Sequence, residues 1–200
     1  MLFLSVDLAS KFSAAMLRDS AGEVHWQGDS GGQSPKKWIS TLKNLVWIAE
    51  NKPEFREQEL HMLVEDIPYG ISNQAMTKPA TRLQGMLMQA IDRDFYFINP
   101  STWQKEYPGV ARAPKGMSKT EGAKYRINAA KTEAQVLGYH APDLVAKWQL
   151  ENPTLKPLKK YTNPLEKQMT DYVDAFLIND WLIRHKDEYT TLTGVQLAMI

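Results

Sequence analysis

Residues 2–28 read LFLSVDLASKFSAAMLRDSAGEVHWQG, and this stretch decides the fold. Residues 2–8 form a short apolar run, as expected for a strand buried on both faces, and the run carries one acidic residue, Asp7. Residues 12–18 and 23–28 are two further strand candidates, and residues 19–22 between them have the composition of a hairpin turn. The chain is therefore predicted to open with three sequential antiparallel strands.

Helices and strands alternate after this opening. Short apolar runs indicate strands at residues 60–64 and 95–98. Helical spacing of apolar residues covers 35–50, 73–91, 118–137, 144–150 and 164–184. A short helix is also predicted around Trp103, where the spacing of Ser101 and Gln104 fits a capping box. This order predicts an α/β fold with a mixed five-stranded sheet, three antiparallel and then two parallel strands, flanked by helices.

The length and composition indicate one globular domain. A chain of 200 residues buries a sizeable core, and 24% charged with 43% hydrophobic residues is close to the globular average. The apolar N-terminal run meets Asp7 too early to serve as a signal-peptide core or a membrane span. We expect a soluble, cytoplasmic, single domain over residues 1–200 with no membrane partner and an irregular, lysine-bearing insert around 139–165.

The residue types restrict the chemistry of any metal site. The chain has no cysteine, which excludes disulfides, thiolate nucleophiles and zinc-thiolate sites. Its four histidines are not placed at metal-ligand spacing on one helix. A metal site must therefore be built from oxygen ligands, which favours magnesium, manganese or calcium.

Acidic residues mark three separate predicted elements. Asp171 and Asp174 lie three residues apart on an otherwise apolar helix and share one face of it, whether that face is turned to solvent or to the sheet. The first and fourth strands end in Asp7 and in Glu65-Asp66, and these strands are predicted to be neighbours. A helix packed across them completes a cage of four carboxylates. Such a cage suits two Mg²⁺ or Mn²⁺ ions, one activating a water and one stabilising the leaving oxygen of a phosphodiester.

Three segments, LSVDLAS, MLVED and DYVDAF, resemble the metal-binding motifs of the RuvC-like Holliday junction resolvases of the ribonuclease H-like superfamily. The resemblance implies a ribonuclease H-like fold and a catalytic, metal-binding set of Asp7, Glu65, Asp171 and Asp174. It implies two Mg²⁺ (or Mn²⁺) ions per site, no small-molecule cofactor, a branched DNA substrate and a homodimer. Asp66 directly follows Glu65, and strand parity places the two on opposite faces, so only one serves the cage. We take Glu65 as the ligand.

Substrate contacts are predicted from charge and aromatic residues. The formal net charge is only +1, but basic residues concentrate between 105 and 131. Five of them resemble the basic helix with which resolvases bind phosphates: Lys115, Lys119, Lys124, Arg126 and Lys131. Tyr69 either stacks on an unpaired base at a junction centre or packs on the fold. Trp38, Trp47 and Trp181 are predicted to be core or subunit-contact residues.

Three functional hypotheses follow from the sequence. The first is a structure-selective endodeoxyribonuclease that resolves four-way junctions as a homodimer, each subunit nicking one strand. The second is another ribonuclease H-like nuclease that acts on flaps, hybrids or single strands. The third is a catalytically silent, nucleic-acid-binding relative that retains only the fold.

Overall fold

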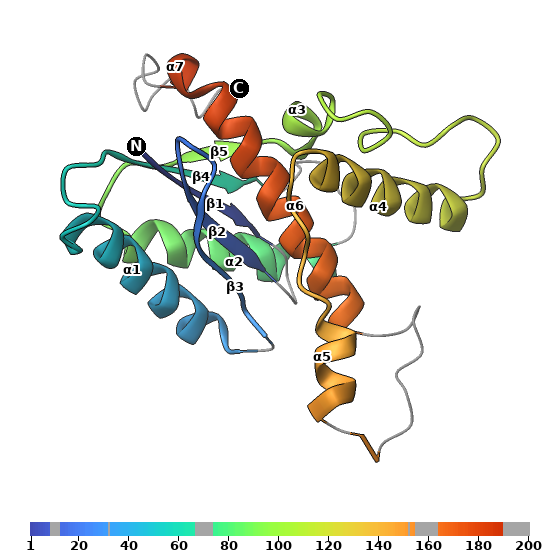
Figure 1. Cartoon of the computed structure of the whole chain (residues 1–200), viewed down its shortest axis with the longest axis horizontal. Coiled ribbons are helices and arrows are strands. Elements are labelled where there is room, and N and C mark those ends of the chain that lie inside the picture. Colours follow the sequence, from blue (N-terminus) through green and yellow to red (C-terminus); the bar gives the residue numbers. More distant parts are fainter. Residues whose placement is uncertain (9–12, 32, 67–73, 152, 155–163, 190–200) are drawn as a thin grey trace.

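The computed structural model describes the chain except for residues 9–12, 32, 67–73, 152, 155–163 and 190–200 (Figure 1). Its sheet has five strands: β1 (Leu2–Asp7), β2 (Ala14–Asp19), β3 (Val24–Asp29), β4 (Leu60–Glu65) and β5 (Tyr96–Ile98). The strand order is β3-β2-β1-β4-β5. β1, β2 and β3 pair antiparallel, and β4 pairs parallel with both β1 and β5. The predicted α/β class, with a mixed five-stranded sheet of three antiparallel and then two parallel strands, is confirmed.

Helices cover both faces of this sheet. They are α1 (Pro35–Asn51), α2 (Gln74–Ala90), α3 (Pro100–Gln104), α4 (Lys119–Val136), α5 (Leu144–Glu151), α6 (Pro164–Arg184) and α7 (Lys186–Tyr189). α1 and α2 share one buried apolar cluster with Leu4 and Val6 of β1. The other cluster joins Phe3 of β1 to α6, which crosses the sheet in Figure 1. Alternate residues of β1 therefore face different helical layers, as the strand period requires.

The starts of α1, α3 and α4 follow local sequence signals, although the signal predicted for α3 was the wrong one. Ser34 caps α1 with Pro35 in its first turn. A capping box of Ser118 and Glu121 begins α4. The predicted capping box at Ser101 is wrong, because α3 begins at Pro100 and Asn99 is its N-cap. Pro100 has no backbone N–H and fits the first helical position, which leaves the capping role to the residue before it.

Two buried polar side chains fix α6 on the sheet. Ser5 of β1 donates from Oγ to the carbonyl of Ala175 over 2.7 Å. Asn179 donates from Nδ2 to the carbonyls of Phe3 at 2.7 Å and Met16 at 3.2 Å. Both side chains are buried. Because these bonds join α6 to β1 and β2 directly, they set where the acidic part of α6 lies over the sheet.

The tryptophans predicted at apolar helix positions have two different environments. Trp38 of α1 and Trp181 of α6 are buried in the two cores. Trp47 is 61% exposed, so it is not a core residue of this chain. In the part of the chain that the structure describes, no helix is long and apolar enough to cross a lipid bilayer.

Candidate metal centre

Asp7 and Glu65 end two parallel neighbouring strands at the same edge of the sheet. Val6 pairs with Val64, so the next position along each strand is an acidic residue. Ser5 contacts α6, and Leu63 belongs to the α6-side core, so the residues two positions later share that face. Asp7 is 5% exposed and Glu65 is partly buried. The sheet therefore brings the two carboxylates together under α6.

The electrostatics of Glu65 reflect this crowding. Burial raises the pKa of Glu65 well above its ordinary value, and the charge of Asp7, a hydrogen bond with Asp7 and the charge of Asp174 raise it further. A hydrogen bond from Trp103 acts in the opposite direction and lowers the pKa. The carboxyl pair can therefore share a proton, or can hold a cation in its place.

The two aspartates of α6 lie beside this pair. Asp174 is half-buried, and its charge is close enough to raise the pKa of Glu65. Asp171 is 3% exposed and lies one helical turn before Ala175, the residue that accepts the bond from Ser5. The side of α6 that carries Asp171 therefore faces the sheet, and neither aspartate is turned fully into solvent.

Asp66 lies on the other side of the sheet from Glu65. Gln84 of α2 donates from Nε2 to its Oδ1 over 3.2 Å, and α2 covers the face opposite α6. Strand parity explains the separation, because consecutive residues of a strand point to opposite faces. The geometry therefore places Glu65, and not Asp66, beside Asp7.

Trp103 is a contact of this site that sequence reasoning missed. Its indole Nε1 donates to Oε1 of Glu65 over 3.0 Å, and the side chain is 1% exposed. The spacing of Ser101 and Gln104 predicted a short helix around Trp103, but no sequence pattern connects Trp103 to a residue 38 positions earlier. The contact arises only from the way α3 packs against the end of β4.

The donor set suits a hard divalent cation, because every candidate ligand is a carboxylate. Like charges buried together are tolerated when a proton or a metal ion offsets their repulsion. The oxygens are not yet at ligand distances from one another, since no three of the predicted ligands lie with one oxygen each within 4.8 Å. Metal binding at this site would therefore draw the carboxylates closer together.

Within the described residues, the group that does meet this distance lies elsewhere, at Asp19, Glu23 and His25 on the β2–β3 hairpin. Asp19 Oδ1 accepts from the backbone N–H groups of Ala21 and Glu23, each at 2.9 Å. Its Oδ2 lies 3.0 Å from His25 Nε2. These contacts are those of an aspartate that closes a turn, so the hairpin accounts for the group without a metal.

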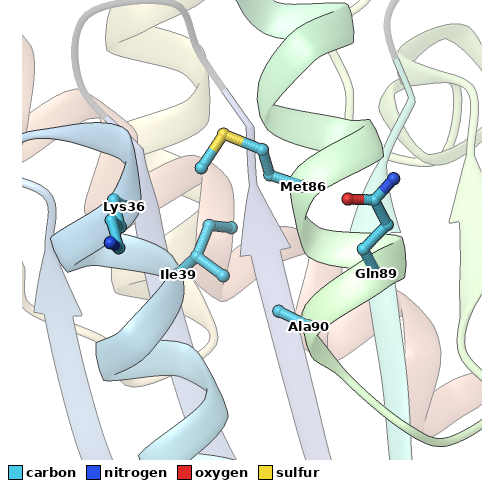
Figure 2. A pocket seen from close by; sticks show the side chains of 5 residues that line it. All are labelled: Lys36, Ile39, Met86, Gln89 and Ala90. Atoms are coloured by element: carbon cyan, nitrogen blue, oxygen red, sulfur yellow. The ribbon is translucent and has the colours of Figure 1, made fainter.

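A pocket between α1 and α2 is also separate from the carboxylates. Figure 2 shows its lining side chains, which are Lys36, Ile39, Met86, Gln89 and Ala90. Ile39, Met86 and Ala90 belong to or pack on the core of the α1–α2 side, whereas Asp7 faces α6. The pocket is therefore not part of the candidate metal centre.

The predicted DNA-binding residues gather around α4. Lys115, Lys119, Lys124 and Arg126 are exposed, and Lys131 is half-buried. α4 packs against α6, the helix that carries Asp171 and Asp174. Tyr69 lies outside the described residues, so its predicted role stays a prediction.

Comparisons with known proteins give similarity to solved structures only. No family model matches the chain, and no curated protein matches it. Thermus thermophilus RuvC in complex with a Holliday junction substrate is 9% identical, with 92% of this chain and 95% of that chain covered and a TM-score of 0.49. Thermus thermophilus RuvC alone is 13% identical, covers 93% and 97%, and has a TM-score of 0.48. The Aquifex aeolicus Ppx/GppA phosphatase, in its type II variant, is 10% identical, covers 93% and 92%, and has a TM-score of 0.35. These values assign no family to the chain.

Proposed function

We propose that this chain is a divalent-metal-dependent endonuclease that cuts branched DNA, with four-way junctions as its substrate. The observation that carries the proposal is the buried contact between the carboxylates of Asp7 and Glu65, with Asp174 close enough to act on the same group. In this proposal Asp7, Glu65, Asp171 and Asp174 hold two Mg²⁺ or Mn²⁺ ions. The whole chain, residues 1–200, forms one nuclease domain.

A purely structural role does not explain why these acidic side chains are buried together. Buried carboxylates in mutual contact destabilise a fold unless protonated or metal-bound, and an uncharged pair of similar size would pack there at lower cost. A cation between them would replace this repulsion by attraction. The arrangement therefore supports a site selected for binding a metal ion.

The bound ions would lower the pKa of an attacking water and stabilise the leaving oxygen of the phosphodiester. The chain's own residues would fix where these ions bind. Asp7 and Glu65 come from adjacent strands of the sheet, and Asp171 and Asp174 come from a helix that Ser5 ties to the same sheet. Ligands on strands and helices are held more precisely than ligands on loops.

The substrate assignment rests on the basic surface around α4. Its exposed lysines and arginine can neutralise backbone phosphates, and α4 packs on the helix that carries two of the proposed ligands. Tyr69 is proposed to stack on an unpaired base at the junction centre. A homodimer would place two such sites on two symmetry-related strands.

The test is cleavage of a synthetic four-way junction beside flap, RNA–DNA hybrid and linear duplex controls, with and without Mg²⁺ or Mn²⁺. We expect metal-dependent, paired symmetric nicks in the junction. Asp7→Asn and Glu65→Gln should abolish cutting and retain junction binding, because each keeps the side-chain size and removes a charged ligand.

Asp66→Asn is the matched control, since Asp66 lies one residue from Glu65 but bonds to α2. It should cut like the wild type. Cutting confined to flaps or hybrids would replace the junction assignment with another nuclease activity. Binding of DNA without cutting in either metal would identify a catalytically silent relative, and cutting that survives in Asp7→Asn would exclude this site.

A further inference from the structure

The side chain of Trp103 packs in a core and also makes a polar contact with Glu65. Its ring is buried in the α6-side core and meets Tyr107 edge to face, with centroids 6.1 Å apart. The indole N–H is a donor with no acceptor capacity, and here it is directed at Oε1 of Glu65. Trp38, in the other core, has a buried indole nitrogen with no hydrogen-bond partner among the described residues. The fold thus accommodates a buried indole without an acceptor, and packing alone does not require the contact with Glu65.

We propose that Trp103 is a positioning residue for Glu65, which fixes the rotation of that carboxylate so that it is presented to a metal ion together with Asp7. The inference rests on the proposed metal site. A glutamate side chain has three rotatable bonds, so an unrestrained Glu65 loses side-chain entropy when it binds a cation. A donor that holds one of its oxygens beforehand reduces that loss. Hydrogen bonds to metal ligands commonly change metal affinity by about 10- to 100-fold.

The position of Trp103 is itself fixed by contacts with α6, the helix that carries Asp171 and Asp174. Just after α3, the Tyr107 hydroxyl lies 2.8 Å from the carbonyl of Leu177 and 2.9 Å from Oδ2 of Asp180, both on α6. Arg184 of α6 donates from Nη1 to Glu106 over 2.7 Å. These bonds hold the segment after Trp103 on α6. The indole therefore keeps one position relative to both Glu65 and the acidic part of α6.

The chain contains a matched control. Trp181 is also buried, and its Nε1 donates to a glutamate, Oε1 of Glu106, over 2.8 Å. Glu106 belongs to the network with Arg184 and is not a candidate metal ligand. Trp103→Phe and Trp181→Phe thus each remove a buried indole N–H bonded to a carboxylate, but only the first lies at the site.

The first measurement is Mn²⁺ binding to the purified full-length protein without DNA, followed by the electron paramagnetic resonance signal of free Mn²⁺. We expect Trp103→Phe to weaken Mn²⁺ binding about 10-fold or more, and Trp181→Phe to bind like the wild type. Urea unfolding of both variants separates a loss of affinity from a loss of fold. Equal Mn²⁺ affinity in a folded Trp103→Phe and the wild type would overturn the positioning role.

A second measurement needs no variant at the site, in case Trp103→Phe does not fold. The six tryptophans give six indole N–H resonances in the ¹⁵N-labelled wild type, and Trp→Phe variants at the other five positions assign that of Trp103 by elimination. Mg²⁺ should shift the Trp103 resonance and leave that of Trp181 in place. A Trp103 resonance unmoved by saturating Mg²⁺ would overturn the inference while leaving the nuclease proposal standing. A wild type that binds neither ion would overturn both.

Discussion

Ser5 and Ala175 are 170 residues apart in the chain, yet a buried hydrogen bond of 2.7 Å joins Ser5 Oγ to the Ala175 carbonyl. Ser5 lies two residues before Asp7 on the same face of β1. Ala175 directly follows Asp174 on α6. One bond thus connects β1, which carries Asp7, to α6, which carries Asp171 and Asp174, close to the candidate metal centre.

Removal of this bond should lower stability. Ser5→Ala leaves a buried carbonyl without its side-chain donor, so we expect the free energy of unfolding to fall by about 1–3 kcal/mol in urea titration. Thr41→Ala is the control, because Thr41 makes the same kind of bond to the Lys37 carbonyl at the surface of α1. Its effect should stay within about 0.5 kcal/mol. Equal stability of Ser5→Ala and the wild type would show that the bond does not hold α6.

Gly109 lies before α4 and Gly138 after it. Alanine variants at these two positions allow the cost of backbone strain to be measured separately from the cost of steric contact. Gly109 has a φ of +78°, and a Cβ there would lie 3.0 Å from both Ala129 and Tyr125 of α4. Gly138 has a φ of +85° with open space around it. Alanine at either position adopts a left-handed backbone, at a cost of about 1–2 kcal/mol.

Gly109→Ala must in addition displace α4 or the loop before it. We expect it to lower the free energy of unfolding by about 1–3 kcal/mol more than Gly138→Ala does, measured in urea. Equal losses of unfolding free energy in the two variants would mean that the loop around Gly109 moves away from α4 at no measurable cost. A larger loss in Gly138→Ala would contradict the contact altogether.

Much of the architecture was predictable because its signals are local. A short apolar first strand and the hairpin turn at residues 19–22 predicted the antiparallel part of the sheet, and the alternation of helices with apolar runs predicted the parallel part. The cap of α3 was misassigned. Weighing Pro100 as a first helical residue would have selected Asn99 from the sequence.

The contacts around the site could be predicted from the sequence only in part. Parity along one strand was enough to separate Glu65 from Asp66, and the structure places them on opposite faces. The bond from Trp103 to Glu65 depends on how two elements pack, and no local rule contains that information. The same holds for Ser5, whose partner is a backbone carbonyl on a helix far away in the sequence.

The basic residues of α4 should control how DNA binding depends on salt. If Lys124 contacts a phosphate, Lys124→Ala should weaken junction binding and lower the slope of log K against log salt concentration by about 1. Lys43→Ala is the control, because Lys43 is also exposed but lies on α1, which packs on the opposite face of the sheet. Fluorescence anisotropy with a labelled junction at several salt concentrations gives both slopes. An unchanged slope in Lys124→Ala would remove α4 from the DNA-binding surface.

His185, which directly follows α6, should make the free energy of unfolding depend on pH. Its Nε2 lies 2.9 Å from Oε1 of Glu106, its Nδ1 lies 3.1 Å from Glu188, and its ring stacks on Trp181. Burial lowers the pKa of His185, but the hydrogen bonds and charges of Glu106 and Glu188 outweigh it and raise the pKa above the ordinary 6.5. Arg184 competes for the same Glu106 carboxylate and keeps its charge at every pH used here.

The sign follows from this upward shift. Below the unfolded-state pKa the imidazolium is present in both states, so its ion pairs contribute fully, and the contribution is lost as pH rises through the higher folded-state pKa. We therefore expect the wild type to exceed His185→Gln in free energy of unfolding most at about pH 6, with the difference shrinking toward about pH 8.5. Urea unfolding at a series of pH values measures it. His140→Gln, at an exposed histidine in the chain segment after α4, should follow the wild-type pH profile. A difference for His185→Gln that grows with pH would mean that the ring is bound neutral, and would contradict the ion pairs with Glu106 and Glu188.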